Sequence, residues 1–256
     1  MTFKSTHFFA VLFLLFSVNV KSDNASITLS AQQLLHREIE LSEVISHVYL
    51  LQLNFLDQDI KEALQQAQQT LDNGIRALPQ EIENQSLNAQ LKNIKSLWLA
   101  ASNHLDWLST LPSGSNSPNM NTLMSFLVRM NHQFLIMRQR LTGGQPSYPF
   151  LEQALLIQQL TRDYLAMLVA EKKGENIDNN QLRINAMVRR FDQKLNSFEL
   201  ALAQHTHAGK PIQEAIYTWQ YIRKQFDGVR RTPLPELMIR YTNSVTNKLH
   251  SLHRMF

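Results

Sequence analysis

Residues 86–110, SLNAQLKNIKSLWLAASNHLDWLST, carry the pattern that decides the fold. Their apolar residues recur in alternating steps of four and three, the spacing of a helix that packs one face against other helices. These residues are Leu87, Leu91, Ile94, Trp98, Ala101, Leu105 and Leu108, and Ser86 is placed to cap the start. Residues 121–141 repeat this spacing, with Asn121 as the capping candidate. Two such seams predict helices packed as a left-handed bundle.

The rest of the chain shows the same helical periodicity less regularly. Further helices are expected near 30–56, 58–78, 149–173, 180–205, 211–227 and 233–255. Breaks are expected where Gly, Pro, Ser and Asn cluster, among them residues 142–149 and 207–211. No alternating apolar and polar run bounded by turns indicates a strand. The sequence therefore predicts an all-α protein of about eight helices, arranged as two tandem four-helix-bundle units.

The second half of the chain resembles the first. Asp72 aligns with Asp192 at an offset of 120, while Trp98 with Trp219 and Asp106 with Asp227 align at an offset of 121. A helix bundle can also imitate itself through its periodicity, so coincidence is the alternative to duplication. The expected organisation is a signal peptide at 1–22, one unit at 23–141, a connector at 142–149 and a second unit at 150–256. In the alternative, no connector separates the units. The helix over 121–141 instead continues beyond residue 141 and joins the two units rigidly.

The N-terminus has the order of a secretory signal peptide, with Lys4 followed by an apolar run from Phe8 to Val18. No other apolar stretch approaches 18 residues, so a soluble protein of the periplasm or the extracellular medium is expected. The chain has no cysteine, which excludes disulfides, thiolate metal sites and covalent c-type haem. Without Lys4 and Lys21 the formal charge falls from +4 to +2, and we expect no nucleic-acid partner.

A row of metal-ligand residue types lies in the first helix, at the spacing of successive helical turns. It comprises His36, Glu40, Glu43 and His47. The two ends of the row are about 16 Å apart at the rise of an α-helix, so one ion cannot bind all four. The favoured interpretation is a solvent-exposed face, and no cofactor is expected. Haem ligation by Met130 or Met137 is the other cofactor option, but both occupy seam positions typical of core packing.

Arg37 is the unusual residue of this helix because it lies one turn before Leu41 on the apolar side. Its guanidinium either extends to solvent from a packed stem or binds a small oxyanion. At the other end of the chain His250 and His253 lie in the last helical turns, where cationic side chains complement the helix dipole.

Motifs for catalysis are missing from the sequence. It contains no Gly-x-Ser-x-Gly elbow, no phosphate-binding glycine loop and no His-Glu-x-x-His pattern. We therefore expect a protein that is not an enzyme.

Residues 36–44, HREIELSEV, followed by YLL at 49–51, resemble the first helix of the sensor module of type IV pilus methyl-accepting chemotaxis transducers, which is related to nitrate/nitrite sensors. The family motif Gly-Arg-Gln-Arg-Met-Leu-Ser-Gln-Arg is matched at its first arginine by Arg37 and at its Leu-Ser by Leu41 and Ser42. In the second half Leu160-Thr161 takes the Leu-Ser place and Arg162 follows it. The resemblance implies a four-helix extracytoplasmic sensor that binds a small anion through these residues. The motif's glycine and two of its arginines are absent, which leaves one arginine of the motif, Arg37, in each chain. Two guanidinium groups around one anion would therefore require a homodimer.

Sensors of that family are usually tethered to a kinase or methyl-accepting domain, which residues 1–256 do not contain. The leading hypothesis is a non-enzymatic sensor-like or adaptor protein that binds a small ligand, a membrane signalling partner, or both. The alternatives are a metal- or haem-binding bundle and a structural partner in an envelope complex.

Overall fold

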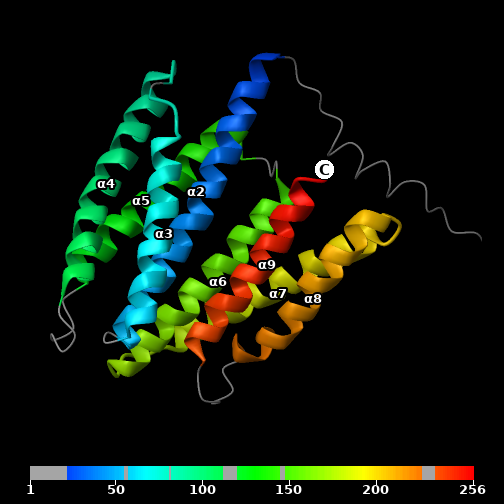
Figure 1. Ribbon diagram of the computed structural model, residues 1–256. Coiled ribbons are helices and arrows are strands. Elements are labelled where there is room, and N and C mark those ends of the chain that lie inside the picture. The colour runs from blue at the N-terminus through cyan, green and yellow to red at the C-terminus, as the bar shows by residue number, and fades with distance from the viewer. Residues whose placement is uncertain (1–21, 55–56, 81, 112–119, 145–147, 227–233) are drawn as a thin grey trace, which may run out of the picture.

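The computed structural model describes residues 22–54, 57–80, 82–111, 120–144, 148–226 and 234–256, and these residues form eight helices and no strand (Figure 1). The all-α prediction is therefore confirmed for them. In chain order the helices are α2 (Ser22–Leu53), α3 (Gln58–Arg76), α4 (Gln85–Thr110), α5 (Asn121–Thr142), α6 (Pro149–Lys172), α7 (Asp178–Leu202), α8 (Thr206–Phe226) and α9 (Pro235–His253). The predicted signal peptide, apart from Ser22, lies outside the described residues.

Three predictions about helix ends are wrong. The residue that caps α4 is Asn84, whose side chain accepts hydrogen bonds from the backbone N–H groups of Ser86 and Leu87. Asn121 is the first helical residue of α5, after a cap position at Met120 that makes no side-chain cap bond. The expected break at 207–211 lies inside α8, which begins at Thr206 and contains Pro211. A proline so close to a helix start removes only one early hydrogen bond, so the helix forms around it.

The connector between the units ends α5 sharply. Gly143 takes a left-handed conformation with φ 60°, and the N–H of Gly144 donates to the carbonyl of Gln139 at 3.0 Å. Glycine has no Cβ to oppose this backbone conformation. The helix over 121–142 therefore does not run on into α6, and the alternative of a rigid continuous helix is wrong.

Each half of the chain is a four-helix unit. In the first unit α2 packs against α3 and α5, and α4 packs against α5 and α3. In the second unit α6 takes the place of α2, with α7, α8 and α9 following in the same order around the bundle. The first unit buries the two apolar seams that the sequence predicts, including Leu91, Trp98 and Phe134.

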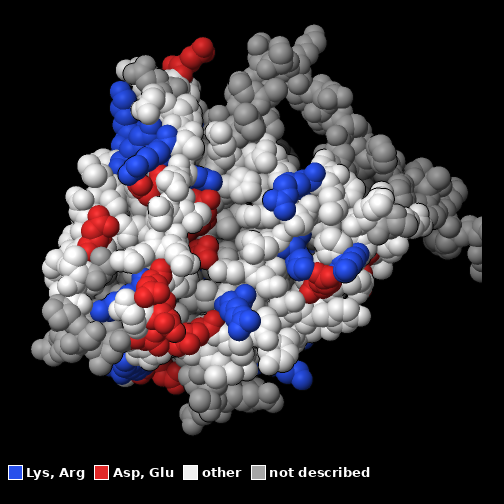
Figure 2. All heavy atoms as spheres, in the orientation of Figure 1, with Lys and Arg blue, Asp and Glu red and all other residues white. Residues whose placement is uncertain are grey.

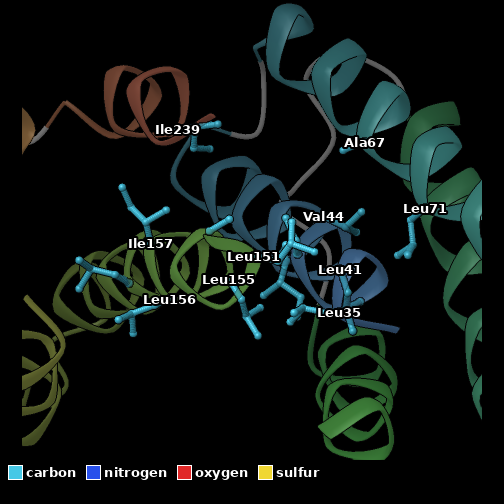
Figure 3. Close-up of a cluster of buried hydrophobic side chains, with 14 of the residues drawn as sticks. Leu35, Leu41, Val44, Ala67, Leu71, Leu151, Leu155, Leu156, Ile157 and Ile239 are labelled. Atoms are coloured by element: carbon cyan, nitrogen blue, oxygen red, sulfur yellow. The ribbon is translucent and has the colours of Figure 1, made fainter. Parts of the chain in front are cut away.

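The two units meet through their first helices, α2 and α6. At one end Arg138 pairs with Glu38 of α2 and lies 4.0 Å from Glu152 of α6, while at the other end Lys172 of α6 donates to the carbonyl of Leu53 at 2.8 Å. The two helices therefore run parallel. Leucines from both meet between them, as Figure 3 shows for Leu35 of α2 with Leu151 and Leu155 of α6. One continuous apolar core consequently joins the units.

Reciprocal contacts relate the units by an approximate two-fold rotation about an axis parallel to α2 and α6. α9 of the second unit contacts α2, and the equivalent helix α5 of the first unit reaches α6 through Arg138. α2 and α6 each contact the other unit through the face that points away from the third helix of their own unit, which is α4 for α2 and α8 for α6. Equivalent faces of the two units thus point in opposite directions.

The aligned Trp and Asp residues make the same contact in both units. Trp98 Nε1 donates to Asp72 Oδ1 at 2.9 Å, and Trp219 Nε1 donates to Asp192 Oδ1 at 2.6 Å. Buried positions of α4 also match those of α8 at the predicted offset of 121, in the pairs Leu91/Ile212, Ile94/Ala215, Ala101/Ile222 and Leu105/Phe226. Periodicity alone does not produce matched hydrogen bonds, so these contacts support duplication. Asp227, the predicted counterpart of Asp106, lies outside the described residues.

None of the helices in the described part of the chain combines the length and the apolarity needed to cross a bilayer.

Candidate functional site

The polar row of α2 is largely shielded from solvent, with His47 buried and the other three residues partly buried, which overturns the prediction of a solvent-exposed face. The His47 side chain is 6% exposed, the Glu40 side chain is 18% exposed, and the neighbouring Glu38 is 1% exposed. The physical reason is the central position of α2, which is covered by α3 and α5 of its own unit and by α6 and α9 of the other.

Polar side chains of α9 face this row. Gln32 lies 2.8 Å from His253 Nε2, and the rings of His36 and His250 meet edge to face with centroids 5.0 Å apart. Two turns further along α2, Glu43 Oε1 accepts a hydrogen bond of 2.6 Å from Asn243. The row is therefore part of the junction between the units, which we call the α2–α9 seam: Gln32, His36, Arg37, Glu40, Glu43 and His47 of α2 with Asn243, His250 and His253 of α9.

Arg37 lies at the edge of this seam, where α3 approaches α2. Its guanidinium rests against Gly74, and a Cβ at that glycine would lie 1.4 Å from Arg37 Nη1. Arg37 Nη2 donates to Glu40 Oε1 at 2.8 Å. Of the two alternatives for Arg37, extension into solvent does not fit, because only 17% of the side chain is exposed.

Several polar atoms of the seam are buried without a hydrogen-bond partner among the described residues. They are Arg37 Nε, Glu40 Oε2, His47 Nδ1 and His250 Nε2. Each such atom costs about 1–3 kcal/mol relative to its hydrated state. The pair formed by Arg37 and Glu40 is thus half satisfied, with one hydrogen bond made and one donor and one acceptor left over.

Burial shifts the protonation of the seam toward neutral forms. It raises the pKa of Glu40 to about 7, with Arg37 opposing the shift and Glu43 adding to it. It lowers the pKa of His36 to about 4, helped by His250 and Arg37, and the pKa of His250 also falls to about 4, for which Arg254 is the second cause. His250 is therefore neutral at pH 7, so the prediction that it complements the helix dipole as a cation is wrong.

These shifts act on stability with opposite signs. Unfolded histidines take up protons near pH 6.5, whereas folded His36 and His250 remain neutral down to about pH 4, so their contribution is present above pH 6.5 and lost as the pH falls toward 4. Glu40 has a raised pKa, so its contribution is full below about 4.5 and is lost as the pH rises through 7.

We predict that replacing His36 and His250 with glutamine makes the free energy of unfolding fall less steeply between pH 6.5 and pH 4, because two proton-binding groups of the unfolded chain are removed. Urea unfolding at a series of pH values measures this slope. The matched control is His132→Gln, on the exposed side of α5, which should keep the wild-type slope. A double variant with the wild-type slope would contradict the burial of these histidines.

The other residues implied by the family resemblance do not join Arg37. Leu41 is completely buried in the core, and Ser42 donates its hydroxyl to the carbonyl of Glu38 at 2.9 Å. Arg162 pairs with Asp163 at 2.9 Å, close to α7. In the alignment of Leu160-Thr161 with Leu41-Ser42, Leu156 takes the place of Arg37, so the motif in the second half supplies no arginine at that place.

The metal-ligand residue types of the seam do not form a cation site of the usual kind. Among the described residues, no three His, Asp or Glu side chains converge closely enough to hold one ion. Met130 and Met137 lie in the core of the first unit with at most 1% exposure.

Three features of the site were not singled out from the sequence. Glu38 forms a two-pronged ion pair with Arg138, with its carboxylate oxygens 2.6 and 3.3 Å from the arginine nitrogens. The guanidinium of Arg37 packs against Gly74, and Asn243 donates a hydrogen bond to Glu43. An isolated glycine inside a helical pattern is a signal of close packing, so Gly74 was detectable. Asn243 had no such signal.

Comparisons with known proteins found no matching family model, no matching curated protein and no matching solved structure.

Proposed function

We propose that this protein is a non-enzymatic, sensor-like or adaptor module that binds a small ligand at the α2–α9 seam. The observation that carries the proposal is the buried, half-satisfied pair of Arg37 and Glu40 at the junction of the two units. Buried polar groups are normally hydrogen-bonded, and unsatisfied ones in a native fold call for an explanation. A bound ligand supplies one.

The two atoms without partners define the chemistry of the ligand. Arg37 Nε offers a donor and Glu40 Oε2 offers an acceptor, so a molecule with an anionic oxygen and an N–H group satisfies both. An amino acid zwitterion has this combination. A simple anion such as nitrate, which the family resemblance implies, satisfies Arg37 alone.

The seam gives ligand binding a mechanical consequence. Arg37 contacts α3 through Gly74, while its neighbour His36 contacts His250 of α9 in the other unit. A ligand that repositions Arg37 therefore changes the packing of α2 between the two units. In the proposed role this change is read by a membrane-bound sensor or an envelope protein in the periplasm, or outside the cell.

The test is ligand-induced thermal stabilisation of the wild type and three variants. Sodium nitrate, sodium succinate and glycine are the probes. A ligand at 100 times its dissociation constant adds about 2.7 kcal/mol, roughly 5–10 °C in Tm for a chain of this size. We expect this gain for glycine in the wild type, and little or no gain in Arg37→Ala.

Two further variants make the test specific. Gly74→Ala displaces the guanidinium without removing it, so it should also lose the response. Arg129→Ala removes an exposed arginine of α5 and should respond like the wild type. A response that is equal in the wild type and Arg37→Ala, or absent in the wild type for all three probes, contradicts the proposal.

A further inference from the structure

Each unit has an aromatic hollow between its third and fourth helices. In the first unit the hollow lies between α4 and α5, has a volume of about 520 Å³, and is lined by His104, Trp107 and Phe126 among others. In the second unit it lies between α8 and α9, has a volume of about 300 Å³, and is lined by Tyr221, Lys224 and Leu234 among others.

The two hollows occupy overlapping places in their units. Buried positions of α5 and α9 match at an offset of 115, in the pairs Leu123/Met238, Leu127/Thr242, Met130/Val245, Phe134/Leu249 and Met137/Leu252. This register pairs Phe126 with Tyr241. Each of these rings meets a ring from the third helix of its unit, His104 at 5.7 Å and Tyr221 at 5.0 Å between centroids.

Apolar surface at the hollows is exposed to solvent. Trp107 is 49% exposed, whereas Trp98 and Trp219 are 3% and 2% exposed. Tyr221 is 62% and Leu234 is 45% exposed at the second hollow. Grouped apolar exposure of this kind marks interaction surfaces in soluble proteins.

The helices that form the hollows carry more basic than acidic side chains. α5 has three arginines and no carboxylate, and α4 has two lysines and one aspartate. Arg129 beside the first hollow and Lys224 in the second form no ion pair within the described residues. On the face shown in Figure 2, basic side chains predominate over α8 and α9, while acidic ones lie mainly over the first unit. An acidic partner complements the basic side chains over α8 and α9 and Arg129 of α5, whereas Arg138 of α5 is already paired with Glu38.

The two-fold relation between the units limits which kind of partner can occupy both hollows. It directs the two hollows to opposite sides of the molecule, with α4 and α8 at opposite edges of the view in Figure 1. A planar surface such as a membrane can touch only one of them at a time. Two separate short segments can occupy both.

We propose that each hollow binds one short, acidic, amphipathic helix of a partner protein, so that one chain holds two such segments on opposite sides. The apolar face of the segment lies on Trp107 and Phe126 in one unit and on Tyr221 and Leu234 in the other. Its carboxylates meet Arg129 and Lys224. The inference is independent of ligand binding at the α2–α9 seam.

The experiment is calorimetric titration of the full chain with a synthetic peptide of about five helical turns, with Leu and Phe on one face and Glu elsewhere. We expect two peptides per chain, and an affinity at least about tenfold lower when the salt rises from about 0.03 to 0.3 M. Trp107→Ala and Tyr221→Ala should each leave one peptide per chain, and the double variant none. Both residues are exposed, so the fold should tolerate these changes.

Controls separate this proposal from its rivals. A scrambled peptide without the amphipathic spacing and a version with Lys in place of Glu should bind at least about tenfold more weakly, and equal binding of either overturns the proposal. So does the absence of binding at about 1 mM peptide and low salt. Trp107-dependent binding to phosphatidylglycerol vesicles without peptide binding assigns the hollow to a membrane instead. A dimer that dissociates in Trp107→Ala assigns it to a second copy of this chain.

Discussion

Replacing Arg138 with methionine is expected to lower the free energy of unfolding at pH 7 by about 3–5 kcal/mol, because the change leaves a buried carboxylate without its partner. Glu38 is 1% exposed, and its two oxygens accept hydrogen bonds of 2.6 and 3.3 Å from Arg138. Methionine keeps most of the buried stem, so the loss reports the ion pair rather than a cavity. Urea denaturation followed by circular dichroism measures it.

The pH dependence of this variant has a defined sign. Burial raises the pKa of Glu38 even with Arg138 present, and the loss of Arg138 removes the interaction that opposes this rise. Protonated Glu38 carries no charge, so the destabilisation should shrink as the pH falls through the raised pKa. Glu38→Gln combined with Arg138→Met should recover most of the stability at pH 7. Arg140→Met, at an exposed arginine bonded to Ser86, should cost less than about 0.5 kcal/mol. Equal stability of the two single variants at positions 138 and 140 would contradict the ion pair's role.

Truncating either of the two matched tryptophans to alanine is expected to cost about 3–5 kcal/mol. Trp98 and Trp219 fill equivalent core positions, and each donates a hydrogen bond to an aspartate of the preceding helix. Trp219 also packs on Phe191, with ring centroids 4.5 Å apart. Because the core is continuous through α2 and α6, we expect both variants to unfold in one transition at a lowered midpoint.

Calorimetry with circular dichroism distinguishes one cooperative molecule from two independent units. Trp107→Ala is the matched control, since that tryptophan is half exposed and its loss should cost clearly less than the loss of either buried tryptophan. If Trp98→Ala or Trp219→Ala unfolds only half of the helical signal at the lower midpoint, the shared α2–α6 core does not couple the units.

The positions of the helices were predictable from the sequence because the apolar seams are regular. The seams at 87–108 and 123–141 are the buried faces of α4 and α5, and the predicted limits of those helices agree with the structure to within a residue. Helix caps were less predictable, since several neighbouring polar residues compete for one backbone position. Asn84 and Ser86 illustrate this competition at the start of α4.

The burial of the polar row was not predictable from periodicity, which shows which residues share a face but not what covers that face. α2 has an apolar row with Leu41, Val44 and Val48. Packing against the other helices of the first unit explains the burial of this row but not the burial of the polar row. Leu34, Leu35 and Ile39 extend apolar character around the helix, which is a sign of a helix covered on several sides. The residues that face the polar row, Asn243 and His250, come about 200 positions later in the chain.

The α2–α9 seam shields most of the Glu40 side chain from water and places it beside Arg37, whose Nε has no hydrogen-bond partner among the described residues. The most direct test is a titration of the Glu40 side-chain carboxyl by ¹³C NMR, with the resonance assigned through Glu40→Gln. We expect a pKa of about 7 for Glu40, and a change in that pKa when glycine is added to the wild type but not to Arg37→Ala. A pKa close to the ordinary value of 4.5, unchanged by glycine, would show that Glu40 is neither shielded from water nor part of a ligand site.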